Sequence, residues 1–358
     1  MTVASYARRR LAPAEATLRY VRAGSGTIRY LGWLGHQNLG DEAVHQAAAR
    51  YLAPGTLAWR PERVPSPFGG VAGRLTHTMT MLGGGTLLGG RYIDDFVAAP
   101  REQRAVFGSG VIDPAFPHSY RGGAGSLDRW VDAIRDIPVL GVRGPRSQEI
   151  LAERGVAAEV IGDPVAAYVC PEGHWDPVER TIGLNVGQSN GAVWGSELSL
   201  LAGIADSIRA LVADGWSVEY YVVWPGDLEV TRMIARDTGT ANAPIHTIYV
   251  DPEEFLLRSR HLTAFVGLKL HAVALATCAG VPSASIEYHP KCRDFMASIG
   301  LDRLVVRSDE ISGPAVGELV ARLVAEGPAI SAAARDRLTD LRALQQAAAS
   351  RLVALARG

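Results

Sequence analysis

Residues 262–291 read LTAFVGLKLHAVALATCAGVPSASIEYHPK. The stretch begins with an apolar, strand-like run at 262–266, continues with an apolar, helix-like run at 270–279, and ends with a second strand-like run at 283–286. Short apolar strands that alternate with helices are typical of parallel sheets covered by helices. The stretch therefore predicts an α/β fold.

Ionisable side chains follow each of these two strands at the point where the strand ends. Lys269 and His271 follow the first strand, and Glu287, His289 and Lys291 follow the second. Loops at the carboxyl ends of neighbouring strands converge on one crevice, where ligands bind. Two lysines and an imidazole there suit an anionic, phosphorylated substrate, and an imidazole can transfer protons near neutral pH. The alternative interpretation is that each is an ordinary surface residue.

The same alternation of strands and helices extends outward in both directions. Further strands are predicted at 27–34, 78–82, 105–107, 138–142, 160–161, 181–186, 218–224 and 246–250. Residues 65–73 and 128–136 fit neither pattern and are interpreted as surface loops. The pattern favours two Rossmann-like domains that face each other across a cleft.

A break in the pattern at residues 170–180 contains Pro171, Gly173 and Pro177 and reads as an interdomain linker. We expect an N-terminal Rossmann-like domain at 1–172 and a C-terminal Rossmann-like domain at 173–328. A C-terminal helix at 329–358 is long enough to cross back onto the first domain. The alternative is one large doubly wound domain.

Composition excludes several classes of protein. The 358 residues include 36 Lys and Arg against 37 Asp and Glu, so no global attraction to nucleic acid is expected. Cys170, Cys278 and Cys292 are far apart, which predicts neither a metal site nor a disulfide framework. With no apolar run typical of a secretory signal or a membrane span, the expected location is the cytoplasm.

A second informative loop, GHQNLGDE at residues 35–42, joins the first strand to its helix. Asn38 or Asp41 could cap the helix, and acidic residues in a first turn suit the helix dipole. One interpretation is a capped turn without chemistry; the other is a loop whose amides and carboxylates bind substrate hydroxyls. The loop lacks the GxGxxG pattern, so a dinucleotide site is not predicted.

Three shorter motifs also follow predicted strands. The run Gly83–Gly85 allows either a tight turn or close approach of backbone amides to a phosphate. Arg143 lies where a strand meets a helix N-terminus and is interpreted either as an anion ligand or as a surface ion pair. Asp163, between Gly162 and Pro164, is expected in a turn at a strand end, where it could orient a residue of the cleft, although a structural role is favoured.

Taken in order, these motifs resemble the polysaccharide pyruvyl transferase family. The likeness spans residues 35–300 and is carried by these motifs and by residues 279–282 (AGVP) and 288–291 (YHPK). In one departure, Lys269 stands where the family usually has arginine. Lysine keeps the charge but lacks the bidentate fork of a guanidinium.

The resemblance implies a GT-B-like fold with the acceptor side on the first domain and the donor side on the second. It implies transfer of a pyruvyl group from phosphoenolpyruvate to sugar hydroxyls as a ketal, with release of phosphate and without a cofactor or metal. The partners would be phosphoenolpyruvate and a sugar or glycan acceptor. A lipid-linked acceptor would place the protein at a membrane surface.

The resemblance also implies roles for the residues named above. Lys269 and Arg143 would hold the donor phosphate and carboxylate, with His271 as general acid. Asp41 or Glu42 would bind or deprotonate the acceptor. The remaining expected contacts are with the donor, by Lys291, Glu287, Gly84 and Gly85, and with the acceptor, by Asn38 and His36.

Two other functions fit the same pattern. A nucleotide-sugar glycosyltransferase would also place a cation and a carboxylate near a diphosphate, and fold alone does not separate the two. The other alternative is a non-catalytic binding protein of a glycan pathway. Binding of phosphoenolpyruvate or of a nucleotide sugar would discriminate among these possibilities.

Overall fold

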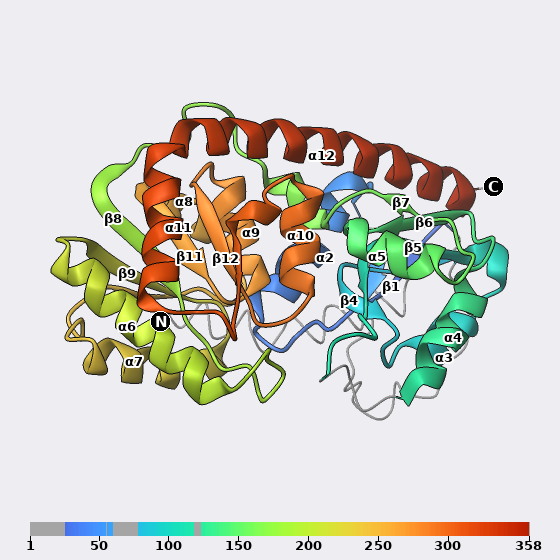
Figure 1. The fold of residues 1–358 in the computed structure, drawn as a ribbon. Helices are drawn as coiled ribbons and strands as arrows, with labels where there is room; N and C mark the ends of the chain where they lie inside the picture. Colours follow the sequence, from blue (N-terminus) through green and yellow to red (C-terminus); the bar gives the residue numbers. More distant parts are fainter. Residues whose placement is uncertain (1–25, 55, 60–77, 118–122, 358) are drawn as a thin grey trace, which may run out of the picture.

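The fold is α/β, with two parallel sheets that are each covered by helices (Figure 1). The computed structural model describes residues 26–54, 56–59, 78–117 and 123–357, and the side chains of 123–126 are not considered. Each sheet belongs to one Rossmann-like domain, as the strand–helix alternation predicted.

The first sheet has the order β2-β1-β3-β5-β6-β7, and its strands run parallel. A short strand, β4, continues the line of β3 along β5. The strand order reverses between β1 and β3, so the loops after these two strands flank a switch point. The strands are β1 Ile28–Leu31, β2 Leu57–Trp59, β3 Met79–Leu82, β4 Gly85–Leu88, β5 Arg104–Val111, β6 Val139–Val142 and β7 Glu159–Val160.

The second sheet is also parallel and has the order β10-β9-β8-β11-β12-β13. Counted along the chain, this is the 3-2-1-4-5-6 order of a Rossmann fold, with its switch point between β8 and β11. The strands are β8 Val178–Asn185, β9 Ser217–Val222, β10 Ile245–Thr247, β11 Leu262–Gly267, β12 Ser283–Glu287 and β13 Val305–Arg307.

Four of the helices begin after a residue whose side chain caps them. The side chains of Asn38, Ser196, Asp251 and Ser312 accept hydrogen bonds from the amides of the turns that follow them. The helices are α2 Leu39–Tyr51, α3 Ile93–Val97, α4 Gly123–Ile134, α5 Pro145–Ala152, α6 Glu197–Ala213, α7 Leu228–Asp237, α8 Pro252–Ser259, α9 Leu270–Cys278, α10 Lys291–Ser298, α11 Gly313–Ala325 and α12 Gly327–Arg357, with a short 3₁₀ helix, η3, at Pro164–Tyr168.

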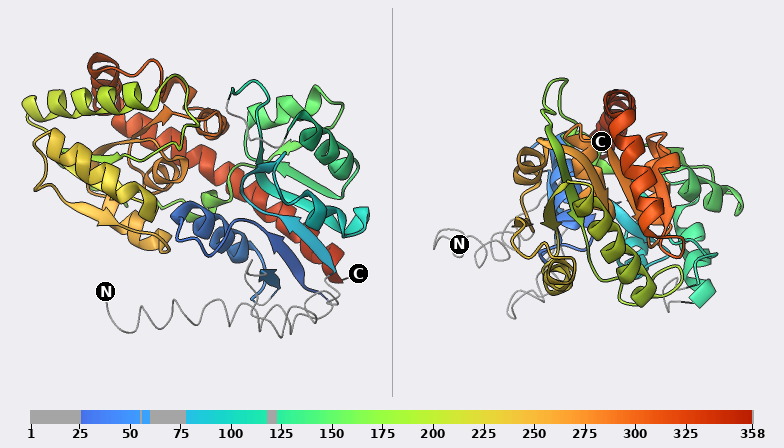
Figure 2. Two further views of the ribbon diagram at one scale, coloured as in Figure 1. Left: turned by 90° about the horizontal axis from the view of Figure 1, so that it is seen from below. Right: turned by 60° about the vertical axis from the view of Figure 1, so that its left-hand side comes forward.

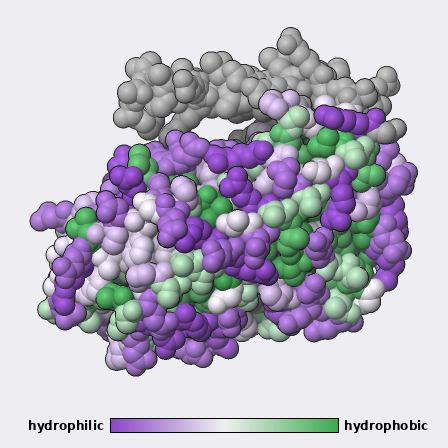
Figure 3. Space-filling model, turned by 90° about the horizontal axis from the view of Figure 1, so that it is seen from above, coloured by the Kyte–Doolittle hydropathy of each residue, from purple (hydrophilic) through white to green (hydrophobic). Residues whose placement is uncertain are grey.

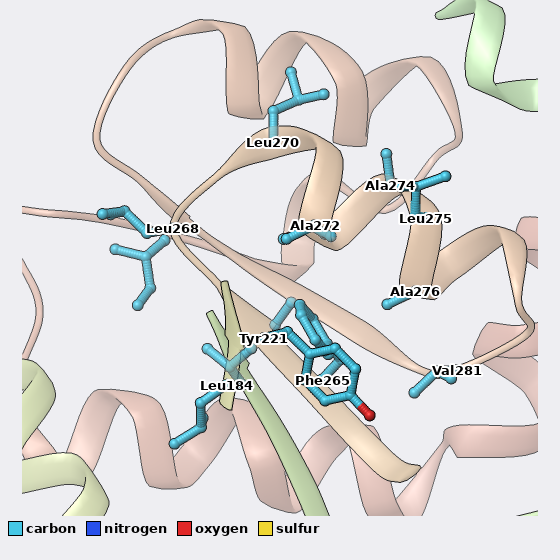
Figure 4. Close-up of a cluster of buried hydrophobic side chains, with 14 of the residues drawn as sticks. Leu184, Tyr221, Phe265, Leu268, Leu270, Ala272, Ala274, Leu275, Ala276 and Val281 are labelled. Carbon is cyan, nitrogen blue, oxygen red and sulfur yellow. The ribbon is translucent and has the colours of Figure 1, made fainter. Parts of the chain in front are cut away.

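Helix α9 is buried on nearly all sides. Ala272 and Leu275 of α9 belong to the same hydrophobic core as Phe265 of β11, and so does Leu268, which precedes the helix (Figure 4). Every residue of α9 is buried except His271, which is partly exposed. This setting explains why an ionisable side chain in the first turn of α9 is informative: it lies at the one accessible end of an apolar helix.

Helix α12 runs from the second domain across to the first (Figures 1 and 2). Its first half packs in the second core through Ile330 and Leu338, and its second half packs on the first sheet through Ala348 and Leu352. Viewed from above, the molecule shows hydrophilic residues interspersed with smaller hydrophobic groups (Figure 3). None of the helices within the described ranges is both long enough and apolar enough to span a membrane.

One expectation about the elements is wrong. Residues 128–136 are not a surface loop, because most of them belong to α4. Trp130 and Ile134 are completely buried, and Leu127 and Val131 are nearly so, which gives the helix an apolar stripe at intervals of three and four residues. The other expected loop, 65–73, lies outside the described residues.

Candidate active site

The loops at the carboxyl ends of the two sheets meet at the site. The backbone N–H of Leu39, at the start of α2, donates to the carbonyl of Val223, which directly follows β9 (3.0 Å). Leu39 and Val44 of α2 are buried in the same hydrophobic core as α9. The switch point of the first domain is thereby held against that of the second.

Lys269 lies at the switch point of the second sheet, between β11 and α9. Its backbone N–H donates to Asn185 Oδ1 (2.7 Å), which fixes the loop to the end of β8. Its ammonium donates to the carbonyl of Gln188 (2.6 Å) in the loop after β8. The rings of Trp224 and Tyr288 flank Nζ at 5.7 and 5.4 Å.

Lys291 also lies close to the ring of Tyr288. Its Nζ is 4.9 Å from the centre of the Tyr288 ring. Of the 36 basic residues in the chain, only Lys269 and Lys291 are lysines. All the others are arginines, so both primary amines of the side chains gather around one aromatic ring.

Asp227 is a completely buried carboxylate beside Lys269, at a distance of 3.5 Å from Oδ1 to Nζ. It also accepts from the backbone N–H of Gln188 (3.1 Å), and it packs so closely on Gly187 that a Cβ there would overlap it. Burial raises the pKa of Asp227, and Lys269 opposes this rise. Asp227 therefore fixes the loop after β8 and is a counterion for the lysine.

His271 lies in the first turn of α9 and faces residues of the first domain. Its Nε2 is 3.5 Å from Oδ2 of Asp163, which is completely buried. On another side the ring lies against Gly40 of α2, where any side chain would overlap Nδ1. His271 thus lies between two motifs that are far apart in sequence, at Gly40 and at Asp163.

Asp41 lies close to His271, Asp163 and Lys291. Burial raises the pKa of Asp41 to about 7, while nearby His271 and Lys291 oppose the rise and Glu42 and Asp163 add to it. A carboxyl group with this pKa can take up or release a proton at neutral pH. The phenol of Tyr30 lies close by, and burial, reinforced by the Asp41 and Asp163 carboxylates, raises its pKa.

Several buried polar atoms of this region have no hydrogen-bond partner within the described part of the chain. They are Tyr30 Oη, Asp163 Oδ2, His271 Nε2 and Asp227 Oδ2. Buried polar groups are normally paired, so a group of unpaired atoms calls for an explanation. Their position around Asp41 and Lys269 is consistent with a polar site for substrate.

The loop before α2 is a capped turn, and the Glu42 carboxyl group is hydrogen-bonded to its backbone. Asn38 Oδ1 accepts from the N–H of Gly40 (3.0 Å), and Glu42 accepts from the N–H of Gly35 (2.9 Å). Burial raises the pKa of Glu42, and the bond from Gly35 opposes this rise. His36 is exposed and stacks on Trp33, with ring centres 4.4 Å apart.

The glycine run after β3 lies next to the same group. A Cβ at Gly84 would crowd Val44 and Pro164, and one at Gly85 would stand 3.9 Å from an Asp41 carboxylate oxygen. Gly85 has φ +101°, which favours glycine. The run therefore permits close packing of the loop against α2 and η3.

The structure does not bring two of the predicted site residues into this group. Arg143 is buried, and its guanidinium donates to Asp294 Oδ2 (3.1 and 3.2 Å) and to Thr86 (3.2 Å). Glu287 accepts from Arg293 (2.7 Å); burial raises its pKa, and Arg293 opposes the rise. These pairings give both residues structural contacts, and their roles at the donor stay predictions.

His289 also lies at the contact between the domains rather than beside Lys269. Its ring packs against that of Phe116, with centres 4.7 Å apart, and its Nδ1 accepts from the N–H of Lys291 (3.2 Å). Burial lowers the pKa of His289, and the nearby charges of Lys291 and Arg143 add to this effect. A neutral, buried imidazole suits a structural role.

Two residues of the site were not predicted from the sequence. Tyr30 lies inside an apolar strand, and Asp227 sits in the segment Trp224-Pro225-Gly226-Asp227, which looks like an ordinary turn. For Asp227 a signal was available, since an acidic residue after a strand next to the switch point can reach the loop of Lys269. Among the described residues, no three His, Cys, Asp or Glu side chains come together to hold a metal ion.

Comparison with known proteins identifies the family. The family model for polysaccharide pyruvyl transferases matches residues 38–290, which is more than half of the chain. The chain belongs to the polysaccharide pyruvyl transferase family. No curated protein matches the chain.

Solved structures with a similar arrangement have little sequence in common with the chain. WaaG, a glycosyltransferase involved in lipopolysaccharide biosynthesis, is 12% identical over 90% of this chain and 98% of its own, with a TM-score of 0.48. A UDP-N-acetylglucosamine 2-epimerase from Listeria monocytogenes is 12% identical over 84% and 88%, with a TM-score of 0.46.

TarM from S. aureus is 8% identical over 78% of this chain, with a TM-score of 0.48. The chain spans only 55% of the length of TarM.

Proposed function

We propose that this protein transfers a pyruvyl group from phosphoenolpyruvate to two hydroxyls of one sugar, forming a ketal and releasing phosphate. Family membership supports the proposal. The observation that carries it is the pair of lysines around Tyr288, with Nζ atoms 5.4 and 4.9 Å from the ring centre. Phosphoenolpyruvate carries two anionic groups, a phosphate and a carboxylate, and each would find a cation there.

The reaction needs proton transfer in both directions. One sugar hydroxyl adds to the enol carbon as the methylene carbon takes up a proton and becomes a methyl group. The C–O bond to phosphate then breaks, and the second hydroxyl attacks the same carbon. Of the two protons that the hydroxyls lose, one balances the new methyl group and the other leaves with phosphate.

His271 and Asp41 fit these proton transfers. In our proposal His271, with Asp163 beside Nε2, gives the proton to the methylene carbon, and Asp41 takes a proton from the attacking hydroxyl. A pKa of about 7 makes Asp41 a stronger base than an ordinary carboxylate and leaves part of it ionised at neutral pH. Glu42 would orient the acceptor loop through Gly35.

The remaining expected residues surround these two groups in the proposal. Gly84 and Gly85 border the site next to Asp41, and Asn38 shapes the loop that would meet the acceptor. His36, stacked on Trp33, would contact a sugar ring from the exposed side. The donor contacts expected of Arg143 and Glu287 stay part of the proposal, and each of these side chains is paired with a charged residue, as Lys269 is with Asp227.

The test is phosphate release from phosphoenolpyruvate with a panel of sugars that have two hydroxyls close enough to close a five- or six-membered ketal ring. Release that requires both hydroxyls supports the proposal, so each active sugar is compared with its singly O-methylated derivative. His271→Gln should abolish most turnover and leave donor binding largely intact. The matched control is His174→Gln, in the segment of the chain between η3 and β8, and it should keep the wild-type turnover. Binding of a nucleotide sugar in place of phosphoenolpyruvate would overturn the proposal.

A second test uses the scarcity of lysine. The amines of the given sequence that an acylating reagent can modify are those of Lys269, Lys291 and the N-terminus, and mass spectrometry of peptides separates the three. Phosphoenolpyruvate should protect both lysines and leave the N-terminal amine reactive. Equal labelling with and without phosphoenolpyruvate would count against this donor site.

A further inference from the structure

Gln345 is a completely buried glutamine in the middle of α12. Its Oε1 accepts from the Tyr51 hydroxyl (2.6 Å), and its Nε2 donates to the carbonyls of Ile161 (2.9 Å) and Asp163 (2.8 Å). Burying an amide is unfavourable unless it is hydrogen-bonded. All three hydrogen bonds of the Gln345 side chain join it to residues outside α12. Two of them hold the segment that connects β7 to η3.

That segment is tightly constrained around Asp163. Gly162 has φ +84°, and a Cβ at this position would crowd Leu341 of α12. Asp163 Oδ1 accepts from the N–H of Val165 (3.1 Å), which fixes the orientation of the carboxylate. The other oxygen, Oδ2, is then directed at His271 Nε2 at 3.5 Å.

We propose that Gln345 is a positioning residue for the imidazole of His271. It holds the backbone of Asp163, and the Asp163 carboxylate in turn lies beside the ring, with Oδ2 3.5 Å from Nε2 of His271. The inference rests on the pyruvyl transfer proposed above and extends the active site to a helix that contributes no residue to substrate contact.

The variant Gln345→Met tests this proposal, because methionine keeps the length of the side chain and removes all three hydrogen bonds. We expect turnover at saturating donor to fall on the order of 10–100-fold, since a misplacement of about 1 Å can cost that much. The KM for phosphoenolpyruvate should stay within about twofold, because Lys269 and Lys291 do not touch this segment.

Two controls separate positioning from loss of stability. Gln346→Met changes the exposed neighbour on the same helix and should behave like the wild type. Tyr51→Phe removes one hydrogen bond of the same buried amide but keeps both bonds to the segment, so turnover should remain near the wild-type value. An equal loss of turnover in Tyr51→Phe and Gln345→Met would overturn the proposal.

A double-mutant cycle with Asp163→Asn tests whether Gln345 affects turnover through the Asp163 carboxylate. Asparagine can still cap η3. If Gln345 acts through the Asp163 carboxylate, Gln345→Met should cause no further loss in the Asp163→Asn background. Additive losses would show that Gln345 acts elsewhere, and unchanged turnover in Gln345→Met would also refute the proposal.

Hydrogen exchange gives a readout that needs no substrate. The Val165 N–H should exchange faster in Gln345→Met than in the wild type or in Gln346→Met, since this amide donates to Asp163. An unchanged exchange rate of the Val165 N–H would contradict the proposal that Gln345 fixes the backbone of residues 161–163. An inactive wild type with faster exchange in Gln345→Met would refute the pyruvyl transfer instead and leave the hold on Asp163 standing.

Discussion

Asp41 and His271 come from different domains, and the surroundings of each include residues that are far away in sequence. Gly40 lets the imidazole pack directly on α2, and burial moves the pKa of the adjacent Asp41 carboxyl to about 7. A base with a pKa near the working pH balances the fraction that is ionised against its strength. The pH dependence of turnover is therefore the measurement that reports on Asp41.

If Asp41 is the base, its ionised form is the active one, and turnover should rise with pH through about 7. Asp41→Asn should remove this rise and lower turnover on the order of 10²–10⁴-fold. The exposed α12 residue Asp336 provides the control, and Asp336→Asn should keep both the rate and the profile. A profile that instead falls through pH 7 in the wild type would make Asp41 the acid.

Lys269 should contribute to the binding of the donor rather than to its turnover. Lys269→Ala should weaken phosphoenolpyruvate binding by roughly 10–150-fold, since a hydrogen bond to a charged group is worth about 1.5–3 kcal/mol. Lys269→Arg should be tolerated, because it restores the family's usual residue. Isothermal titration calorimetry measures both variants, with Arg342→Ala on the exposed side of α12 as control. Wild-type affinity in Lys269→Ala would remove this residue from the donor site.

At the scale of elements, the contact of α2 with α9 depends on the absence of a side chain at Gly40. Gly40→Ala should push His271 out of place, so that turnover falls while the first turn of α2 is also strained. Gly317→Ala in α11 is the matched control, because a Cβ there meets nothing within 4 Å. That change should stabilise the protein by up to about 1 kcal/mol. Phosphate release and urea unfolding measure the two effects, and normal turnover in Gly40→Ala would contradict the packing.

Much of the element pattern could be predicted because it depends on local periodicity. The strands at 262–266 and 283–286 and the helix between them were predicted within one or two residues of β11, α9 and β12. Helix α4 was missed because its stripe of Trp130 and Ile134 is interrupted by charged residues and lies in a glycine-containing region. Strand β4 was missed because it is a short continuation of β3 after two glycines.

The site was harder to predict, since side-chain partners depend on which elements meet. The sequence placed Lys269 and His271 correctly at the end of a strand, because topology alone directs that position to the switch point. It could not show that Arg143 would meet Asp294, a residue 151 positions away, or that Asp163 would face His271. Both partners come from the other domain, and no local pattern encodes such a meeting.

For the whole molecule, the pair of Arg143 and Asp294 joins the two domains inside a buried interface. Asp294 also accepts from the hydroxyl and N–H of Ser147 (2.7 and 3.2 Å). Asp294→Ala would leave a buried guanidinium without its counterion and should lower the free energy of unfolding by about 3–5 kcal/mol.

Asp309 offers the comparison, because its pair with Arg307 is partly exposed on the surface. Asp309→Ala should cost about 0–1 kcal/mol. Urea unfolding measures both variants. Equal losses in the two variants would mean that the buried pair contributes no more than a surface pair, and the domains would then be held mainly by α12 and the apolar core.

The course of α12 across both domains has a consequence for the order in which the protein is made. Ala348 and Leu352 complete the core of the first sheet, yet the ribosome adds them long after that sheet has been synthesised. Ile161 and Ala348 are 187 positions apart, and elongation at about 5–20 residues per second separates them by roughly 10–40 s. During that interval a face of the nascent first domain is uncovered, which makes it a natural client for a chaperone near the exit tunnel.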